Sequence, residues 1–333
     1  MTVYYDDKQE ILSEIFGTTD IELRESSLTV SGKIFPIVDD VIILLKPHQI
    51  PPLISEKIEF TPGDEDVAPS IAKDIQYTFG EEWKTFNEFL PEHHDEFKLY
   101  FDLIDPQALQ SKRICDLGCG IGRWTYFLKD IAKEIVLVDF SESIFEARKN
   151  LAESDNMIFI MADILDLPFQ DDAFDFVFCL GVLHHIPEPA LESVRKLSSL
   201  APEFLIYLYY ALDNRGAFYK LIFYFVNLIR SLICNITSKI ARSVLTEILM
   251  WVLYMPAIIF GKVFSMFWAD ASKVPLHFYE DMNIGRIRQD VYDRFFTRIE
   301  QRLSKKEIHK LSDTFSEIIV SDGLPFWHFL CRK

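Results

Sequence analysis

Short apolar runs alternate with amphipathic stretches through the middle of the chain. The apolar runs have the length and composition of buried strands, and they span residues 113–117, 134–139, 157–161, 174–180 and 204–209. Between several of them, apolar residues at helical spacing predict helices at 123–131, 142–153 and 189–200. Strands that alternate with helices predict a parallel sheet covered on both faces, and ligands of such sheets bind where the strands end.

The C-terminal part of the chain has a different pattern. Residues 315–320 and 325–331 flank Ser321-Asp322-Gly323, which predicts an antiparallel hairpin. Before it, Ser304 is predicted to cap a helix at 305–315, with Glu307 at the capping-box position. A further charged helix is predicted at 290–302.

The turn after the first predicted core strand has glycines at alternate positions, Gly118, Gly120 and Gly122, and follows Asp116. Glycine permits positive φ and close approach of a ligand to the backbone, and a following helix would offer unpaired N–H groups. A dinucleotide site has the spacing G-x-G-x-x-G, but Arg123 stands where the third glycine would be. A carboxylate here repels a pyrophosphate and suits a cationic amino group, which favours S-adenosylmethionine.

Four segments in order resemble the motifs of class I S-adenosylmethionine-dependent methyltransferases, close to the type 11-like small-molecule enzymes. The first is the glycine turn, and the others are 134–140, 161–164 and 174–185; the likeness covers residues 79–210 and, more loosely, 275–333. It implies an α/β fold, a doubly wound Rossmann-like sheet of seven strands with a terminal antiparallel hairpin. It also implies that Asp139 grips the ribose hydroxyls of S-adenosyl-L-methionine and that Asp163 meets the adenine amino group. The implied cofactor-binding residues in the core are Asp116, Gly118, Cys119, Gly120, Asp139, Phe140, Ala162, Asp163, Ile164 and Leu180.

The resemblance divides the chain into a small N-terminal module at 1–60, a helical cofactor-covering segment at 67–112, and a core at 113–333. In the N-terminal module, the pattern predicts a helix at 8–16 that Gly17 ends, a hairpin around Ser31-Gly32, and a strand at 41–45. Residues 33–45 resemble half of a zinc-ribbon-like module found ahead of some methyltransferases. No cysteine precedes Cys115, so we expect a degenerate, metal-free remnant and no metal site. Residues 47–66 are predicted to be a linker.

Aromatic residues recur at helical spacing between residues 71 and 103. Residues 79–83 resemble a motif that precedes the core in a methyltransferase subfamily, which implies that Phe79 and Trp83 cover the cofactor. The aromatics from 86 to 101 favour packing on the core. His93 and His94 are expected to be solvated on a helix surface, because no second pair has metal-ligand spacing.

An apolar helical insertion is predicted at 215–270. From 217 to 268, five basic residues face the single acid Glu247. A spanning helix needs about 20 apolar residues, and the best stretch, 248–269, contains Pro256 and Lys262. A soluble lid that lines an apolar substrate pocket ranks first, peripheral membrane contact through 217–268 ranks close behind, and a true span ranks last.

Composition and charge narrow the partners. The chain has 333 residues and a net charge of −17, which argues against a nucleic-acid binder. Its five cysteines form no C-x-x-C pair, and the acidic N-terminus has no apolar signal region. We therefore expect a cytoplasmic protein without disulfides, with peripheral contact at the inner face of a membrane as an extension; the oligomeric state stays open.

The expected chemistry is an in-line displacement, in which the protein aligns the acceptor with the methyl group and excludes water. His184 and His185 follow the fourth core strand and are the candidate general bases; the alternative is that one of them only bonds the loop backbone. Tyr292 and Asp293 are weaker candidates at the acceptor. Asn-Pro-Pro-Tyr is absent after Cys179, so oxygen or carbon methylation of a small lipophilic or lipid-linked acceptor is favoured over nitrogen methylation of nucleic acid.

Three hypotheses remain. The favoured one is an active small-molecule methyltransferase, which predicts cofactor binding that Asp139→Ala destroys. The second is a catalytically silent protein of the same fold that binds a membrane or a partner. The third, a nicotinamide-dependent oxidoreductase, lacks its glycine spacing.

Overall fold

The computed structural model describes residues 4–58, 76, 80, 89–265, 276 and 279–333. The chain forms two compact units. Unit 1 comprises residues 1–210 and 301–333, and unit 2 comprises residues 211–300. The predicted insertion at 215–270 is therefore too short at its C-terminal end, because the next helix belongs to the same unit.

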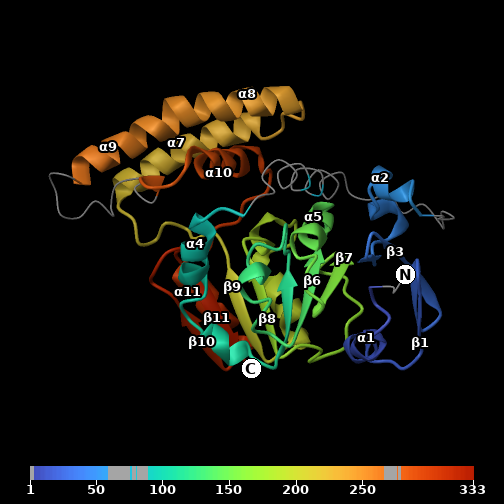
Figure 1. The fold of residues 1–333 in the computed structure, drawn as a ribbon. Coiled ribbons are helices and arrows are strands. Elements are labelled where there is room, and N and C mark those ends of the chain that lie inside the picture. Colours follow the sequence, from blue (N-terminus) through green and yellow to red (C-terminus); the bar gives the residue numbers. More distant parts are fainter. Residues whose placement is uncertain (1–3, 59–75, 77–79, 81–88, 266–275, 277–278) are drawn as a thin grey trace. The chain divides into compact units, whose positions relative to one another are not determined.

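Unit 1 is built on an eleven-stranded sheet with the order β1-β2-β3-β4-β7-β6-β5-β8-β9-β11-β10. Figure 1 shows its central strands side by side. The parallel strands are β5 (Arg113–Leu117), β6 (Glu134–Asp139), β7 (Met157–Met161), β8 (Phe176–Leu180) and β9 (Glu203–Tyr207). The hairpin of β10 (Glu317–Val320) and β11 (His328–Arg332) pairs antiparallel with β9. The predicted α/β sheet and terminal hairpin are confirmed.

Side chains alternate between two apolar clusters, one on each face of the sheet. Cys115 and Val136 belong to one cluster, and their neighbours Ile114 and Ile135 belong to the other. Helix α5 (Ser143–Asn150) follows β6, and α6 (Ala190–Leu197) follows β8. Strands buried on both faces are continuous apolar runs, which explains why the sequence located them so closely.

The helix predicted at 123–131 is wrong. The segment forms turns and a short 3-10 helix at Thr125–Phe127, with i→i+3 bonds such as Leu128 N to Thr125 O at 2.9 Å. Thr125 is a weak helix former, and its hydroxyl donates to Asp116 at 2.7 Å, which also competes with helix formation.

The N-terminal strands extend the core sheet, so residues 1–60 are not the separate module that the sequence predicted. Helix α1 (Gln9–Phe16) and the strands β1 (Ile21–Arg24), β2 (Ser27–Val30) and β3 (Lys33–Val38) lead to β4 (Val41–Ile43). All three residues of β4 are buried, and β4 pairs parallel with β7. The likeness to half of a zinc ribbon stays a prediction.

Short helices fill the remaining connections of unit 1. The predicted linker begins with a 3-10 helix (Pro47–Gln49) and α2 (Pro52–Ser55), followed after the undescribed residues by α4 (Glu92–Tyr100) and a 3-10 helix (Pro106–Leu109). The predicted helix 305–315 is only α11 (Lys305–Ile308) with a 3-10 helix at His309–Asp313; its Ser304–Glu307 capping box is confirmed.

The expectation that both histidines of α4 are solvated holds for one of them. His94 is exposed, with 61% of its side chain accessible. His93 is buried, and its Nδ1 accepts a hydrogen bond from the backbone N–H of Leu90 at 3.1 Å. A buried ring nitrogen with a backbone donor is a structural feature rather than a solvated one.

Unit 2 is helical. It contains α7 (Ala217–Ile233), α8 (Lys239–Leu249), a π-helical turn (Met250–Tyr254), α9 (Met255–Ser265) and α10 (Ile284–Phe296). The helix predicted at 290–302 begins earlier and also ends earlier, at Phe296. It begins at Ile284 because the Asn283 side chain caps it by accepting from Arg286 N. Among the described residues, one helical stretch, Lys239–Val263, is long and apolar enough to cross a membrane, with mean hydropathy 1.8 and 28% of its most apolar window buried.

We expect Tyr5→Phe to lower the free energy of unfolding of unit 1 by about 1–3 kcal/mol. The buried Tyr5 hydroxyl donates to Asp40 O at 2.7 Å and accepts from Phe159 N at 3.2 Å, so phenylalanine leaves both groups unpaired. Urea titration measures the change. Tyr126→Phe, at a tyrosine that is 38% exposed, is the control and should change stability by less than about 0.5 kcal/mol. A Tyr5→Phe protein as stable as the parent contradicts a continuous core.

Candidate functional site

The glycine turn after β5 folds back against the end of β6. Gly118, Gly120 and Gly122 have φ of 78°, 55° and 78°, which side chains other than glycine rarely adopt. The N–H groups of Gly118 and Cys119 both donate to Val138 O, at 2.7 and 3.1 Å. A Cβ on Gly118 would lie 2.3 Å from Val182 Cγ2, so the turn tolerates no side chain there.

Asp139, the predicted ribose ligand, ends β6 and holds the turn in place. Its Oδ2 accepts from Gly120 N at 2.8 Å, and its Oδ1 accepts from the N–H and the hydroxyl of Ser141 at 2.8 and 2.7 Å. Charge-assisted bonds of this kind fix both partners. Asp139→Ala therefore disturbs the turn itself, and loss of binding in that variant would not identify a ribose contact.

Asp116 ends up almost fully buried beside the turn, with 1% of its surface exposed. Its Oδ2 accepts from the Thr125 hydroxyl at 2.7 Å, and among the described residues the other oxygen has no hydrogen-bond partner. Burial, with a smaller contribution from the charge of Asp139, raises the pKa of Asp116 to about 8. A buried carboxyl with one unused oxygen is suited to a cationic ligand.

Asp163 follows β7, one strand further along the same edge. Its Oδ2 accepts from Gln49 Nε2 and its Oδ1 from Leu165 N, both at 3.1 Å. Gln76 Nε2 in turn donates to the carbonyls of Gln49 and Phe140, at 3.0 and 2.8 Å. Sequence reasoning missed both glutamines, because no local pattern marks a residue whose partners lie on other strands.

The other predicted cofactor residues divide between this edge and the undescribed part of the chain. Cys119, Ala162, Ile164 and Leu180 are buried and Phe140 is partly buried, all at or just after the carboxyl ends of β5 to β8. The structure thus brings the predicted core set to one edge. Phe79 and Trp83 lie outside the described residues, although Gly80 between them approaches Ser141, with its ideal Cβ 3.9 Å from Ser141 Cβ.

His184 and His185 form part of a 3-10 helix (Leu183–His185) after β8, and both are buried. His184 stacks on Tyr209 with ring centroids 3.9 Å apart, and neither of its ring nitrogens has a hydrogen-bond partner among the described residues. Burial, reinforced by His185 and Arg302, holds the pKa of His184 well below its usual range. A general base needs a pKa near the working pH, so His184 is a poor candidate for that role.

Tyrosines line the region beside the two histidines. Tyr207 lies 5.9 Å from Tyr209, 5.1 Å from Tyr100 and 6.1 Å from His184, measured between ring centroids. Tyr100 also packs on Trp124 at 4.9 Å. We call Tyr100, Tyr207 and Tyr209 the aromatic wall. Sequence reasoning missed it because Tyr100 comes from α4 and the others from the end of β9.

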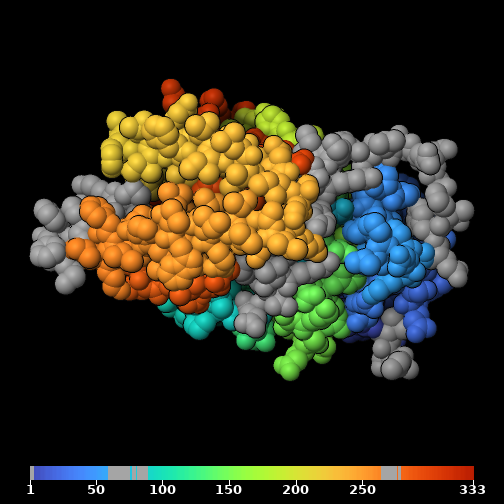
Figure 2. Space-filling view, turned by 90° about the horizontal axis from the view of Figure 1, so that it is seen from above, coloured from blue at the N-terminus to red at the C-terminus, as the bar shows by residue number. Residues whose placement is uncertain are grey.

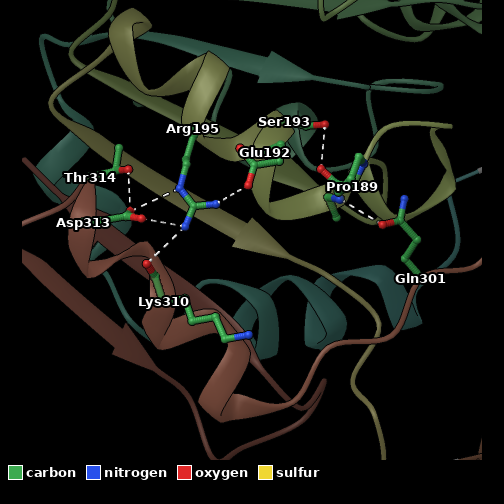
Figure 3. A network of polar contacts seen from close by, with 9 residues as sticks. Pro189, Glu192, Ser193, Arg195, Gln301, Lys310, Asp313 and Thr314 are labelled. Atoms are coloured by element: carbon green, nitrogen blue, oxygen red, sulfur yellow. Dashed lines mark hydrogen bonds and ion pairs between the residues drawn. The ribbon is translucent and has the colours of Figure 1, made fainter.

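Gln301 holds the loop at residues 183–190, which we call the histidine loop. Its side chain donates to Ile186 O and Glu188 O at 2.9 and 2.7 Å and accepts from Ala190 N at 2.9 Å, while its own N–H donates to His184 O at 2.9 Å. Figure 3 shows Gln301 beside Pro189, with Arg195 between Glu192 and Asp313 nearby. The loop is therefore held rigidly from a segment far along the chain.

The two weaker candidates for the acceptor site make their contacts within unit 2. Tyr292 and Asp293 lie in unit 2, where Tyr292 OH accepts from Arg242 at 3.3 Å and Asp293 accepts from the Thr297 hydroxyl at 2.9 Å. Both support the helices of their own unit. Within the described parts of the chain, no group of three or more His, Cys, Asp or Glu residues could hold a metal ion.

Comparison with known proteins identifies the central segment. Residues 114–200 match the family model of a methyltransferase domain. The chain is similar to the demethylmenaquinone methyltransferase of Clavibacter sepedonicus, 40% identical over 79 residues that cover 23% of this chain and 32% of that protein. It is also similar to the ubiquinone biosynthesis O-methyltransferase of Aromatoleum aromaticum, 34% identical over 112 residues (32% and 47%).

A further relative is named for tRNA, and solved structures with a similar fold are also found. The tRNA U34 carboxymethyltransferase of Aliarcobacter butzleri is 35% identical over 106 residues, covering 30% of this chain and 33% of that protein. Among solved structures, magnesium protoporphyrin IX methyltransferase from Synechocystis with bound SAH is 22% identical with a TM-score of 0.32, covering 50% of this chain and 69% of that one. The chain thus spans less than half the length of these curated relatives.

We expect Asp116→Asn to stabilise the ligand-free protein at alkaline pH by a few kcal/mol. The folded pKa is about 8 and the ordinary value is 3.8, so the folded state keeps a proton that the unfolded state has lost. The stability due to this proton is fully present below about pH 3.8 and is lost as the pH rises through about 8. Asparagine keeps the shape and carries no charge, so the variant escapes this loss.

Thermal unfolding of the parent and the variant at several pH values, from about 5 to about 9, measures the difference in stability between them. Asp171→Asn, at an exposed aspartate, is the control and should leave the pH profile unchanged. If the stability of Asp116→Asn and that of the parent depend on pH in the same way, the pKa of Asp116 is not raised.

Proposed function

Because residues 114–200 match the family model of a methyltransferase domain, we propose that the protein transfers a methyl group from S-adenosylmethionine to the oxygen or carbon of a small lipophilic acceptor. The observation that carries the proposal is Asp116, a buried carboxyl with an unused oxygen beside a turn of positive-φ glycines. This combination offers bare backbone and a carboxyl that becomes negatively charged when a cationic ligand displaces its proton.

The residues present fit S-adenosylmethionine. Asp116 would pair with its amino group, and the turn from Gly118 to Gly120 would lie against its amino acid part. The carboxylates of Asp139 and Asp163 can each accept more hydrogen bonds than they do in the free protein, and they would take the ribose and adenine ends on neighbouring strands. When bound, the cofactor supplies an activated methyl group on a sulfonium.

The protein's own task is to place the acceptor and keep water away. The rigid histidine loop and the aromatic wall line the carboxyl ends of β8 and β9, next to the turn. Rings 5–6 Å apart offer flat apolar surfaces to a planar acceptor. For a hydroxyl acceptor we assign His185 as the base, since burial keeps its neighbour His184 neutral and stacked.

The relatives support a lipophilic ring as the acceptor. Two of them are named for demethylmenaquinone and for ubiquinone biosynthesis. Relatives named for tRNA U34 offer the alternative of a nucleic-acid acceptor. The net charge of −17 disfavours that alternative, because tRNA recognition relies on a basic surface. A small aromatic acceptor with an apolar tail is therefore the substrate class that we propose.

Isothermal titration with S-adenosylhomocysteine, with NAD as the control ligand, tests the proposal. We expect binding of S-adenosylhomocysteine alone, weakened at least about tenfold by Asp116→Asn because the ion pair with the amino group is lost. His185→Gln should bind with unchanged affinity and lose turnover on a hydroxylated acceptor. If folded protein gives no heat with S-adenosylhomocysteine, the proposed methyltransferase activity is wrong, and the alternative of a catalytically silent binding protein remains.

A further inference from the structure

Helix α7 presents an apolar stripe that no described part of unit 2 covers. Its members are 49–74% exposed: Phe218, Leu221, Tyr224, Phe225, Leu228 and Leu232. Their spacing of three, four and seven residues places them on one side of the helix. Soluble surfaces rarely collect so many large apolar side chains in one place, so this stripe requires an occupant.

The α8–α9 rod continues the same surface. Ile240, Val244 and Ile248 recur every four residues, and Trp251, Val252 and Phe260 follow, all at least 50% exposed. The π-helical turn at Met250–Tyr254 adds a residue to one turn and so limits the drift of this stripe around the rod. Figure 2 shows α7 and α8–α9 side by side when the molecule is seen from above. We call the exposed apolar side chains of these helices the apolar face.

The apolar face is not needed to hold unit 2 together. The opposite side of the rod, with Met250, Tyr254 and Ile258, packs with Val291 and Phe295 of α10 in a separate buried cluster. The buried cluster on the inner side of the rod therefore supplies the hydrophobic core of unit 2. The exposed side costs solubility without contributing to that core.

Charge selects a lipid surface as the occupant. The helices that carry the apolar face also carry the exposed lysines Lys220, Lys239 and Lys262, of which Lys262 pairs with Asp281 at 3.4 Å. Glu247, the one acid between residues 217 and 268, is neutralised by an ion pair with Arg288 of α10. In a chain of net charge −17, residues 217–268 thus hold five basic residues against one acid, and Trp251 and Tyr224 are residues typical of the bilayer interface.

The inner side of the rod argues that the unit lies on a membrane and does not cross it. Buried Arg242 donates to Ile236 O at 2.6 Å, and Tyr254 OH donates to Asp290 of α10 at 3.2 Å. Helix α10 itself carries Arg286, Arg288, Asp290, Asp293 and Arg294. A span would have to strip the rod from this partner or take these charges into hydrocarbon, which is costly.

We propose that unit 2 is an interfacial membrane-binding unit that inserts its apolar face into the surface of an anionic bilayer. This inference stands on unit 2 alone and does not depend on the catalytic proposal. It also gives the protein a way to reach an acceptor that resides in a membrane.

Co-sedimentation with phosphatidylcholine vesicles, with and without phosphatidylglycerol, tests the proposal. We expect the full-length protein to bind vesicles that contain phosphatidylglycerol, to bind less in high salt, and to be released by alkaline carbonate. The double variant Leu221→Asp/Leu228→Asp should lower the partition coefficient at least about tenfold, because two apolar anchors become charged. Ile34→Asp, at an apolar residue that is 68% exposed in unit 1, is the matched control and should bind as the parent does.

Three results overturn the proposal. One is folded protein that binds neither kind of vesicle. Another is a dimer in light scattering without lipid that the double variant converts to a monomer, which would make a second copy the occupant. The third is protein that only detergent extracts from the vesicles, which would indicate a span. Titration with S-adenosylhomocysteine on the same samples separates each of these from failure of the catalytic proposal.

Discussion

The fold of unit 1 and its candidate site meet in the hydrogen bonds that tie the glycine turn to the end of β6. Val138 O accepts two N–H groups of the turn and Asp139 accepts a third, so β5, β6 and α5 meet at one point. Positive φ at the three glycines makes this approach possible. These hydrogen bonds therefore hold the bare backbone of the turn beside the strand ends that form the candidate site.

The same constraint buries Asp116 at a cost. With a pKa of about 8, this carboxyl is mainly protonated at neutral pH, and a cationic ligand has to displace the proton. Stability and binding thus oppose each other at one residue. Such opposition is typical of functional sites, where a group disfavoured in the free protein becomes favourable in the complex.

The sequence predicted the parts of this protein whose signals are local. Buried parallel strands are apolar runs, and Asp116 and Asp139 end such runs, so both the sheet and its acidic edge were predicted correctly. The helix expected at 123–131 does not form, because the Thr125 hydroxyl bonds to Asp116 outside that segment and so competes with helix formation. Gln301 was missed because its partners lie more than a hundred residues away. The pairing of β4 with β7 is likewise a contact between distant segments.

Proton release on ligand binding tests the central claim most directly. Calorimetric titration with S-adenosylhomocysteine at about pH 7, in buffers of different ionisation enthalpy, counts the protons released on binding. At this pH Asp116 is still mainly protonated, because its pKa is about 8. The account predicts release of about one proton per bound ligand, and almost none in Asp116→Asn. Binding without proton release in the parent, or equal release in both proteins, would contradict the assignment of the buried carboxyl to the cofactor's cation.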